Sequence, residues 1–524
     1  MSSTWIARVV FVISIMLWSI ATIREPLWID ELHSVWCIEG DWQDVLPRAT
    51  VGNQSPLYFY CLKAYVSLFQ LTTEAIGLEP HRWFIVSIRF SSAIGWGVLA
   101  WLMSGELFPT RMTVKADFRT LSPKTMALLA IGIVWLISDR IGTFYSNEVR
   151  PYVWVSAVSF LLLKKTIPTE GTSWAFVAMG CVAFYLHYTT LFVIFVSWMI
   201  RGGNRHLSKR TLLPSLAEGV GLALLMIPGL NHLKTLLKSS SQWAYFAGEY
   251  DLMTVLRVTP WFSWIAIMAF VLLLKFAFSR LRNKVSNVQT SAMSQGQGLV
   301  ANGIALTACC MAACWLLVVG GWAPLMHSRY LMGIYPAIWV VGMGLLASLN
   351  QPRWIMVVGL AAMGTNGWLQ GSWPLWGKGD FVAWQRSEDW IAATKVLQDN
   401  IQKGDLLFFA PMLIETVDQA AMESASELKR QYFSFALSAT LPQLDSIAVE
   451  QIHSIHILSN SVGSWFSTIE HYRKELIGPS RQIWVLARTN QEWSGDDFSL
   501  HELSRVDTLY RAGNLTLWRL RLPL

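Results

Sequence analysis

Two adjacent carboxylates, Asp30 and Glu31, lie in the stretch REPLWIDELHSVW at residues 24 to 36, directly after an apolar run. Acidic side chains are costly at the edge of a membrane segment, where Trp, Tyr, Lys and Arg are the usual residues. A carboxylate in such a place can remove a proton from a hydroxyl group. The structural alternative is that Asp30 caps the helix that begins here, with Glu31 favoured near its positive end. We interpret Asp30 and Glu31 as catalytic candidates.

A second group of polar residues shares one predicted position, at or just beyond the outer ends of apolar segments. Arginine binds phosphate through two parallel hydrogen bonds, so the basic members of this group predict a phosphate site. The expected phosphate ligands are Arg150, Arg329, Tyr152 and Tyr330, and the pocket candidates are His33, Asn53, Gln54, Glu148, His187, Tyr188 and His327. Two structural alternatives stay open: Glu148 could simply pair with Arg150, and His187 could be a hydrogen-bonded residue at a helix end. Arg82 and Arg89 are expected to extend to lipid phosphates.

The composition indicates a membrane protein with many spans. The chain has 524 residues, of which 53% are hydrophobic and only 14% are charged, whereas soluble proteins carry about 25% charged residues. The net charge of +7 comes from Lys and Arg that fall in short loops between apolar runs, where the rules of membrane orientation predict them. Nucleic acid is not expected as a partner.

Stretches of about 20 apolar residues can cross a bilayer core of roughly 30 Å, and the sequence predicts about 11 such helices. Loops rich in Lys and Arg are expected in the cytoplasm, which places the N-terminus inside. The loop of Asp30 and, after an odd number of crossings, the C-terminal part are then outside. The first run lacks a small-residue cleavage site, so we expect a retained helix. The predicted spans are 5–23, 84–107, 125–145, three short helices between 150 and 200, 211–230, 261–279, 299–323, 330–349 and 354–371.

Beyond Trp373 the composition becomes that of a soluble domain. The segment SEDWIAATKVLQDNI has helical spacing, and DLLFFAP, SIHILSN, QIWVLAR and LTLWRLRL have the pattern of buried strands, with SWFSTIEHYRKELI as a helix between two of them. The predicted fold is a polytopic α-helical membrane domain at residues 1–372, with its catalytic outer loop at 24–83, and a small extracytoplasmic α/β domain at 373–524. That domain has no glycine-rich phosphate loop, so no nucleotide site is expected there.

The cysteines predict no metal site. Cys37 and Cys61 share the first outer loop, where they could form a disulfide, although two separate thiols are the favoured interpretation. The other four cysteines lie in apolar runs and are expected to pack there. No cysteine spacing in the sequence resembles a zinc site.

Six motifs follow one another between residues 5 and 350: the DE pair after the first helix, SPLYFY, IRFSSAIGWGVLAWL, YSNEVRPY, HYTTLF and SRYLMGIYP. Together they resemble the polyprenyl-phosphate-sugar-dependent glycosyltransferases of the GT-C superfamily, in the branch of protein O-mannosyltransferases and lipid A aminoarabinose transferases. The resemblance implies a polyprenyl-phosphate sugar donor and an acidic base in the first loop. It makes Asp30 the catalytic aspartate with Glu31 as its neighbour, and Arg150 and Arg329 contacts of the donor phosphate. Relatives often have a Lys before the proline of the second motif, where this chain has Ser55, so no lysine contact or metal ion is carried over for this loop.

The functional expectation is an inverting glycosyltransferase in the plasma (inner) membrane of a bacterium. It transfers a sugar from the polyprenyl-phosphate carrier to an acceptor lipid, glycan or protein on the extracytoplasmic face of the lipid bilayer. No cofactor is specified, and a divalent metal ion is the one candidate. The alternatives are a transporter or flippase of lipid-linked sugars, for which no internal repeat of these motifs is found, and an inactive relative that binds envelope components.

Overall fold

The chain divides into two compact units. Unit 1 consists of Met1–Ile23 and Ile88–Trp384, and unit 2 consists of Arg24–Ser87 and Gln385–Leu524. The computed structural model describes residues 3–21, 27–75, 80–107, 122–167, 171–207, 212–237, 295–320, 327–349, 351–369, 388–402, 405–410, 413, 426–436, 454–457, 465, 469, 482–488, 506–512 and 515–520. The boundary predicted at residue 373 lies outside these residues.

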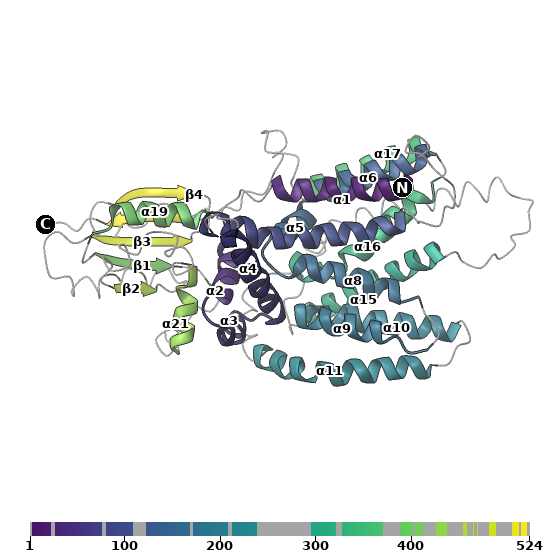
Figure 1. Ribbon diagram of the computed structural model, residues 1–524, viewed down its shortest axis with the longest axis horizontal. Helices are drawn as coiled ribbons and strands as arrows, with labels where there is room; N and C mark the ends of the chain where they lie inside the picture. Colours follow the sequence, from purple (N-terminus) through teal and green to yellow (C-terminus); the bar gives the residue numbers. More distant parts are fainter. Residues whose placement is uncertain are drawn as a thin grey trace, which may run out of the picture. The chain divides into compact units, whose positions relative to one another are not determined.

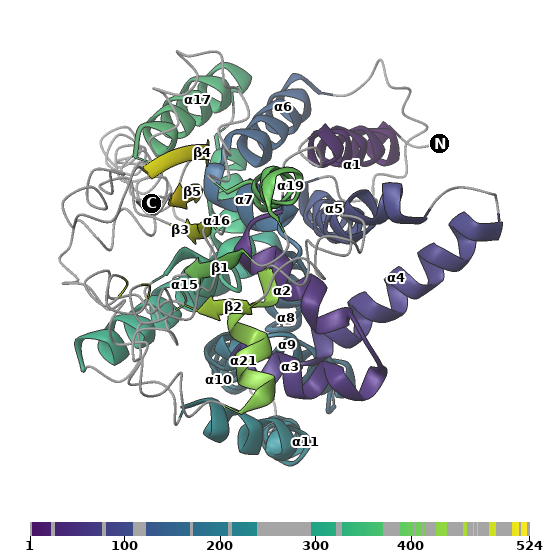
Figure 2. The ribbon, with the colours of Figure 1, turned by 90° about the vertical axis from the view of Figure 1, so that its left-hand side faces the viewer.

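Unit 1 is built of helices that run side by side (Figure 1) and are seen closer to end-on in Figure 2. Its elements are α1 (Ser3–Ala21), the part of α5 (Pro80–Leu107) from Ile88 onward, α6 (Pro123–Ser138), α7 (Arg140–Asn147), α8 (Tyr152–Lys165), α9 (Trp174–Leu186), η3 (Tyr188–Thr190), α10 (Leu191–Leu207), α11 (Leu213–Leu237), α15 (Gln295–Val319), η5 (Ser328–Leu331), α16 (Tyr335–Ala347) and α17 (Pro352–Leu369). Helix α15 packs on α16, α6 packs on α17, and α9 packs on both α8 and α11.

Large aromatic side chains fill the core of unit 1. The rings of Trp135 and Trp339 lie 6.4 Å apart between centroids, and those of Trp96 and Tyr335 lie 6.2 Å apart. All four side chains are buried. Tryptophan is often an interfacial residue in membrane proteins, but these three tryptophans hold helices together, since each ring buries a large apolar area.

Within the described residues, three helices are long and apolar enough to cross a membrane: Phe84–Glu106, Leu213–Leu237 and Gly298–Val319. Shorter apolar helices lie at Trp5–Ile20, Pro123–Ser138, Trp174–Leu186 and Tyr335–Ala347. Every predicted span that falls on described residues coincides with helical structure, whereas the predicted span at 261–279 lies outside them. The total of eleven stays a prediction.

The apolar stretch predicted as one span at 125–145 is divided at Asp139 into α6 and α7. Asp139 is buried, and its Oδ2 accepts a hydrogen bond from the backbone N of Gly142 at 3.1 Å, which makes it the N-cap of α7. Asn366 of α17 donates to the other carboxylate oxygen at 3.5 Å. An aspartate side chain that binds the backbone two or three residues further on competes with the helix and starts a new one.

Unit 2 combines helices near the N-terminus with a C-terminal sheet. Its helices are α2 (Ile29–Ile38), η1 (Trp42–Asp44), α3 (Val45–Val51), α4 (Leu57–Ala75), α19 (Trp390–Asn400) and α21 (Glu427–Phe433), and its strands are β1 (Leu406–Ala410), β2 (Ser454–Ile457), β3 (Ile483–Arg488), β4 (Val506–Ala512) and β5 (Leu515–Leu520). The strand order is β2-β1-β3-β5-β4 (Figure 2), with β1 parallel to β2 and β3, and β5 antiparallel to β3 and β4.

The predicted α/β character of this region is confirmed for the described residues. The four apolar runs predicted as strands form β1, β2, β3 and β5, and the predicted first helix is α19. Strand β4 was not expected, because VDTLYRA has few of the apolar residues that mark a buried strand. The helix predicted in SWFSTIEHYRKELI lies outside the described residues except for Trp465 and Ile469, which are buried in the sheet core.

Candidate functional site

Asp30 and Glu31 lie in the first turn of α2, but their surroundings differ. The helix begins at Ile29, so Asp30 is already inside it and does not cap it. Glu31 is fully buried, and its Oε2 accepts a hydrogen bond from the backbone N of Trp28 at 3.4 Å. Asp30 is partly exposed. The hypothesis that Asp30 caps α2 is wrong, because Glu31 is the residue that binds a backbone N–H at the helix start.

His33 is enclosed within unit 2. Its ring contacts those of Trp36, Phe59, Tyr432 and Phe435 at centroid distances between 5.5 and 5.9 Å. A Cβ atom at Gly52 would lie 1.9 Å from His33 Nε2, so only glycine fits against this ring. These contacts make His33 a core residue of unit 2.

Cys37, Asn53 and Gln54 also have structural contacts in unit 2. The sulfur of Cys37 lies 3.6 Å from His33 Nε2, and no disulfide joins Cys37 to Cys61. The backbone N–H groups of Asn53 and Gln54 donate to Thr50 O and Ala49 O, which ends α3. Asn53 has φ 55°, a left-handed conformation that asparagine tolerates better than most residues.

Glu388 connects the C-terminal part of unit 2 to the residue before Asp30. Its Oε2 accepts hydrogen bonds from the backbone N of Ile29 at 3.2 Å and from Trp390 Nε1 at 2.9 Å. Its Oε1 pairs with Arg488 of β3. Glu388 and Trp390 are buried. The position of Asp30 on α2 thus depends on a carboxylate 359 residues after Ile29.

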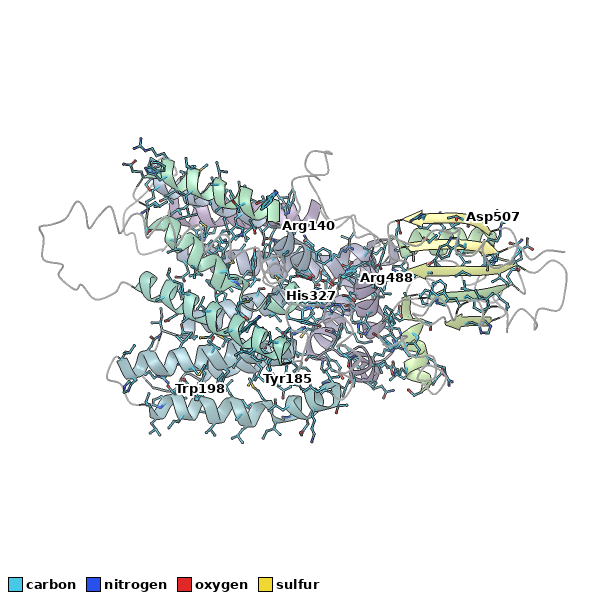
Figure 3. All side chains as sticks on the ribbon, turned by 180° about the vertical axis from the view of Figure 1, so that it is seen from behind. Arg140, Tyr185, Trp198, His327, Arg488 and Asp507 are labelled. Carbon is cyan, nitrogen blue, oxygen red and sulfur yellow. The ribbon has the colours of Figure 1, made fainter. Side chains whose placement is uncertain are left out.

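In unit 1, the predicted phosphate ligands and two histidines form a group that we call the His187 cluster: Arg150, Tyr152, His187, His327, Arg329 and Tyr330. The His187 ring lies 5.6 Å from that of Tyr152 and 5.9 Å from that of Tyr330. The His327 ring lies 6.0 Å from Tyr330, and Arg329 Cζ lies 5.0 Å from the centre of the Tyr330 ring. Figure 3 labels His327 and Arg140 toward one end of the helices of unit 1, with Trp198 toward the other.

The two histidines occupy equivalent local positions. His187 precedes the short helix η3 and His327 precedes η5, and in each case Nδ1 accepts a hydrogen bond at 3.4 Å from the backbone N two residues later, Thr189 or Arg329. A neutral histidine whose Nδ1 is an acceptor carries its proton on Nε2. The cluster therefore contains two imidazole N–H donors whose ring orientation is set by the chain itself.

The electrostatic environment keeps His187 neutral. Burial lowers its pKa, and the positive charges of Arg329 and Arg150 lower it further, to about 3. Both guanidinium groups thus lower the pKa of one imidazole ring, although the two arginines are 179 residues apart in the sequence. An anion bound near His187 would relieve this excess of positive charge.

Neighbouring hydrogen bonds hold the residues on both sides of Arg329. Tyr145 Oη lies 3.0 Å from Ser328 Oγ, and Ser156 Oγ donates to Met332 O at 2.7 Å. The Arg150 turn is held by Ser92 of α5, whose Oγ donates to Glu148 O at 2.8 Å. Preorganised arginines lose less side-chain and backbone entropy when they bind an anion.

Glu148 and Arg150 lie within ion-pair distance of each other inside unit 1. Arg150 Nε lies 4.0 Å from Glu148 Oε1, and both residues are buried. This pairing was the structural alternative for Glu148, and it is compatible with a further contact from Arg150. Arg89 is also buried, so the expectation that it extends to lipid phosphates is wrong. The side chain of Arg82 lies outside the described residues.

Tyr188 belongs to a different group of contacts. Its hydroxyl lies 2.7 Å from His232 Nδ1 of α11, and its ring packs on Phe184 at 4.9 Å. Sequence patterns did not select His232, and they also missed Tyr145, Ser156 and Asp139. A hydroxyl or carboxylate inside an apolar stretch was the only signal that could have found them.

Among the described residues, no group of three or more His, Cys, Asp or Glu is placed to hold a metal ion. The chemistry of the His187 cluster instead matches an anion, because it contains two guanidinium groups and neutral N–H and O–H donors. No protein-family model, curated protein or solved structure matches the chain.

Proposed function

We propose that this chain is an integral-membrane glycosyltransferase of GT-C type, with about 11 spans, that moves a sugar from a polyprenyl-phosphate carrier to an acceptor hydroxyl. The observation that carries the proposal is that the turns of Arg150 and Arg329 meet at the His187 ring, which contacts Tyr152 and Tyr330, and that both arginines lower the pKa of His187. Arginine pairs that share one site bind phosphate groups well. The motif resemblance supports the same donor, and the low charge content supports a membrane location, where a polyprenyl carrier would lie.

The His187 cluster is assigned to the donor phosphate. Arg150 and Arg329 offer N–H donors to the phosphate oxygens, and the hydroxyl of Tyr330 and the Nε2–H of His187 can add neutral donors. When the bond between the anomeric carbon and the phosphate oxygen breaks, the phosphate gains negative charge. Fixed positive charges stabilise that developing charge and lower the barrier.

Asp30 is assigned to the acceptor. The motif resemblance implies that the Asp30 carboxylate accepts the proton of the acceptor hydroxyl as its oxygen attacks the anomeric carbon. Direct attack opposite the leaving phosphate inverts the configuration at that carbon. Asp30 is preferred over Glu31 because it is partly exposed, whereas Glu31 is buried and binds the backbone of Trp28. The proposed location is the plasma (inner) membrane of a bacterium, with Asp30 and the C-terminal domain on the extracytoplasmic side.

The test is transfer of radiolabelled sugar from polyprenyl-phosphate carriers by purified protein, with membrane lipids, glycans and peptides as acceptors. Asp30→Asn preserves size and should retain folding, but loss of the base should lower the rate by about 10²- to 10⁴-fold. The proposal would be contradicted if the carrier were consumed without transfer of its sugar to any acceptor. It would also be contradicted if the carrier were moved across the membrane and no new glycosidic bond formed. Near-normal transfer by folded Asp30→Asn would remove Asp30 from the mechanism.

A further inference from the structure

A cavity of about 380 Å³ lies within unit 2, between the end of α2 and the helix α4. Small-molecule sites commonly have volumes of about 300 to 1,000 Å³. All of its lining residues fall between Ile38 and Phe84, so the cavity is separate from the His187 cluster. No step of the proposed transfer reaction uses it.

Polar and aromatic groups share the walls of this cavity. The polar walls come from Glu39, Asp41, Lys63 and Gln70, and an aromatic wall comes from Trp42. Trp42 has a relative exposure of 50%, although a large aromatic ring is usually more buried in a monomer. Its ring lies parallel to the ring of Tyr60, with the two centroids 6.3 Å apart, and this contact limits its rotation. The ring is therefore a fixed surface against which a ligand can pack.

Lys63 is held in place by the end of α2. Its Nζ donates to Ile38 O, a carbonyl at the C-terminus of the helix, at 2.7 Å, and also to Gly40 O in the turn that follows. A lysine ammonium has a further N–H donor beyond these two. Lys63 is buried, with a relative exposure of 8%, and its Nζ lies 5.7 Å from the Trp42 ring. The ammonium is thus a preorganised donor in the cavity wall.

The turn after α2 supplies the acidic side of the cavity. Gly40 has φ +71°, and a Cβ atom there would lie 2.6 Å from Asp44 Oδ2, so the turn requires glycine. Burial raises the pKa of the Glu39 carboxyl to about 7, with Arg48 acting in the opposite direction. Near neutral pH, Glu39 can therefore both donate and accept a hydrogen bond.

Charge balance in the wall argues against a strongly charged ligand. The positive charges of Lys63 and Arg48 lie near the negative charges of Asp41 and Asp44, and the raised pKa of Glu39 favours its neutral form more than in water. A sugar ring matches these walls, since its hydroxyl groups donate and accept hydrogen bonds and its C–H face packs on an aromatic ring. We propose that this cavity binds a neutral sugar ring, with Trp42 against its C–H face and with Lys63, Glu39 and Gln70 bound to its hydroxyl groups.

The test is saturation-transfer NMR with the purified full chain in a detergent that has no sugar head group. The probes are glucose, mannose, galactose, N-acetylglucosamine and arabinose, with inorganic phosphate as the anionic probe. At least one sugar should saturate with a Kd in the millimolar range, as expected for a small ligand. Trp42→Ala and Gln70→Ala should each weaken its binding by about tenfold.

The matched control is Trp354→Ala, because Trp354 of α17 has a relative exposure of 51% and lies outside the cavity. That variant should bind the sugar like the unchanged chain. Three results would overturn the proposal. They are no saturable binding of any sugar up to about 50 mM, sugar binding by Trp42→Ala and Gln70→Ala that equals that of the unchanged chain, or saturable binding of phosphate alone. Loss of transfer activity has no bearing on this test, since only binding is measured.

Discussion

Replacement of Glu388 by alanine should loosen the start of α2, where Asp30 lies. The change removes the acceptor of two buried donors, Ile29 N and Trp390 Nε1, and the partner of Arg488. A buried donor that loses its acceptor costs about 1 to 3 kcal/mol, so the two donors together predict a loss of about 2 to 6 kcal/mol. Arg488 adds less, because its side chain is 27% exposed and water can solvate it.

The assay is hydrogen exchange measured by mass spectrometry on peptides that cover residues 27–36, combined with a thermal melt. If the Ile29 hydrogen bond contributes about 1 to 3 kcal/mol, local exchange should accelerate by about 5- to 150-fold. Glu388→Gln keeps one acceptor oxygen and should fall between alanine and the unchanged chain. A matched control in the same sheet is Asp507→Ala, which breaks the partly exposed pair with Arg519 and should cost about 1 kcal/mol or less.

Equal melting temperatures of Glu388→Ala and Asp507→Ala, with hydrogen exchange at residues 27–36 unchanged, would contradict this prediction. A second outcome would also contradict it: faster exchange throughout the sheet with no larger change at α2 would mean that Glu388 stabilises the sheet and does not position α2.

Three further predictions concern other parts of the chain. Arg329→Ala should weaken binding of polyprenyl phosphate in vesicles by about 10- to 150-fold, since a charge-assisted bond contributes about 1.5 to 3 kcal/mol. Arg353→Ala removes an exposed arginine at the start of α17 and should leave this binding unchanged. Equal effects of the two substitutions would make Arg329 a general lipid contact. The pKa of Glu39 is about 7 in the folded chain against an ordinary value of 4.5, so the folded chain holds more protons than the unfolded chain between these pH values, and this residue makes stability fall as pH rises through that window. Glu39→Gln should therefore flatten the fall in melting temperature from pH 4.5 to 8. An unchanged slope would contradict this prediction. Asp139→Ala should lower the melting temperature more than Asn366→Ala, because it removes both the cap of α7 and the acceptor of Asn366; the reverse order would show that the cap contributes little.

The sequence predicted those features that depend on local pattern. Apolar runs such as LLFFA at β1 and IWVLAR at β3 were found because a buried parallel strand is apolar on both faces. The turns with Arg150 and Arg329 were selected because their polar residues lie at predicted outer helix ends and arginine binds phosphate through two hydrogen bonds. The tyrosines of both turns, Tyr152 and Tyr330, contact the His187 ring.

Long-range pairings could not be predicted from local pattern. Nothing in the segment around Glu388 marks it as the partner of Ile29, because the hydrogen bond is made by a backbone N–H that every residue except proline has. The different roles of Asp30 and Glu31 were also hidden, since adjacent residues on a helix point about 100° apart and only the fold decides which one is buried. The enclosure of His33 by Tyr432 and Phe435 follows from packing between distant segments.

The division of unit 2 into two separate segments has a consequence for synthesis of the chain. Residues 24–87 leave the ribosome about 300 residues before Gln385, which at about 5 to 20 residues per second is a delay of about 15 to 60 seconds. Throughout that interval, α2 lacks Glu388 at its start, and His33 lacks the rings of Tyr432 and Phe435. Residues 24–87 must therefore wait with apolar surface uncovered. A premature stop before Gln385 would leave a chain in which the helices of unit 1 can pack while Asp30 never acquires its final position.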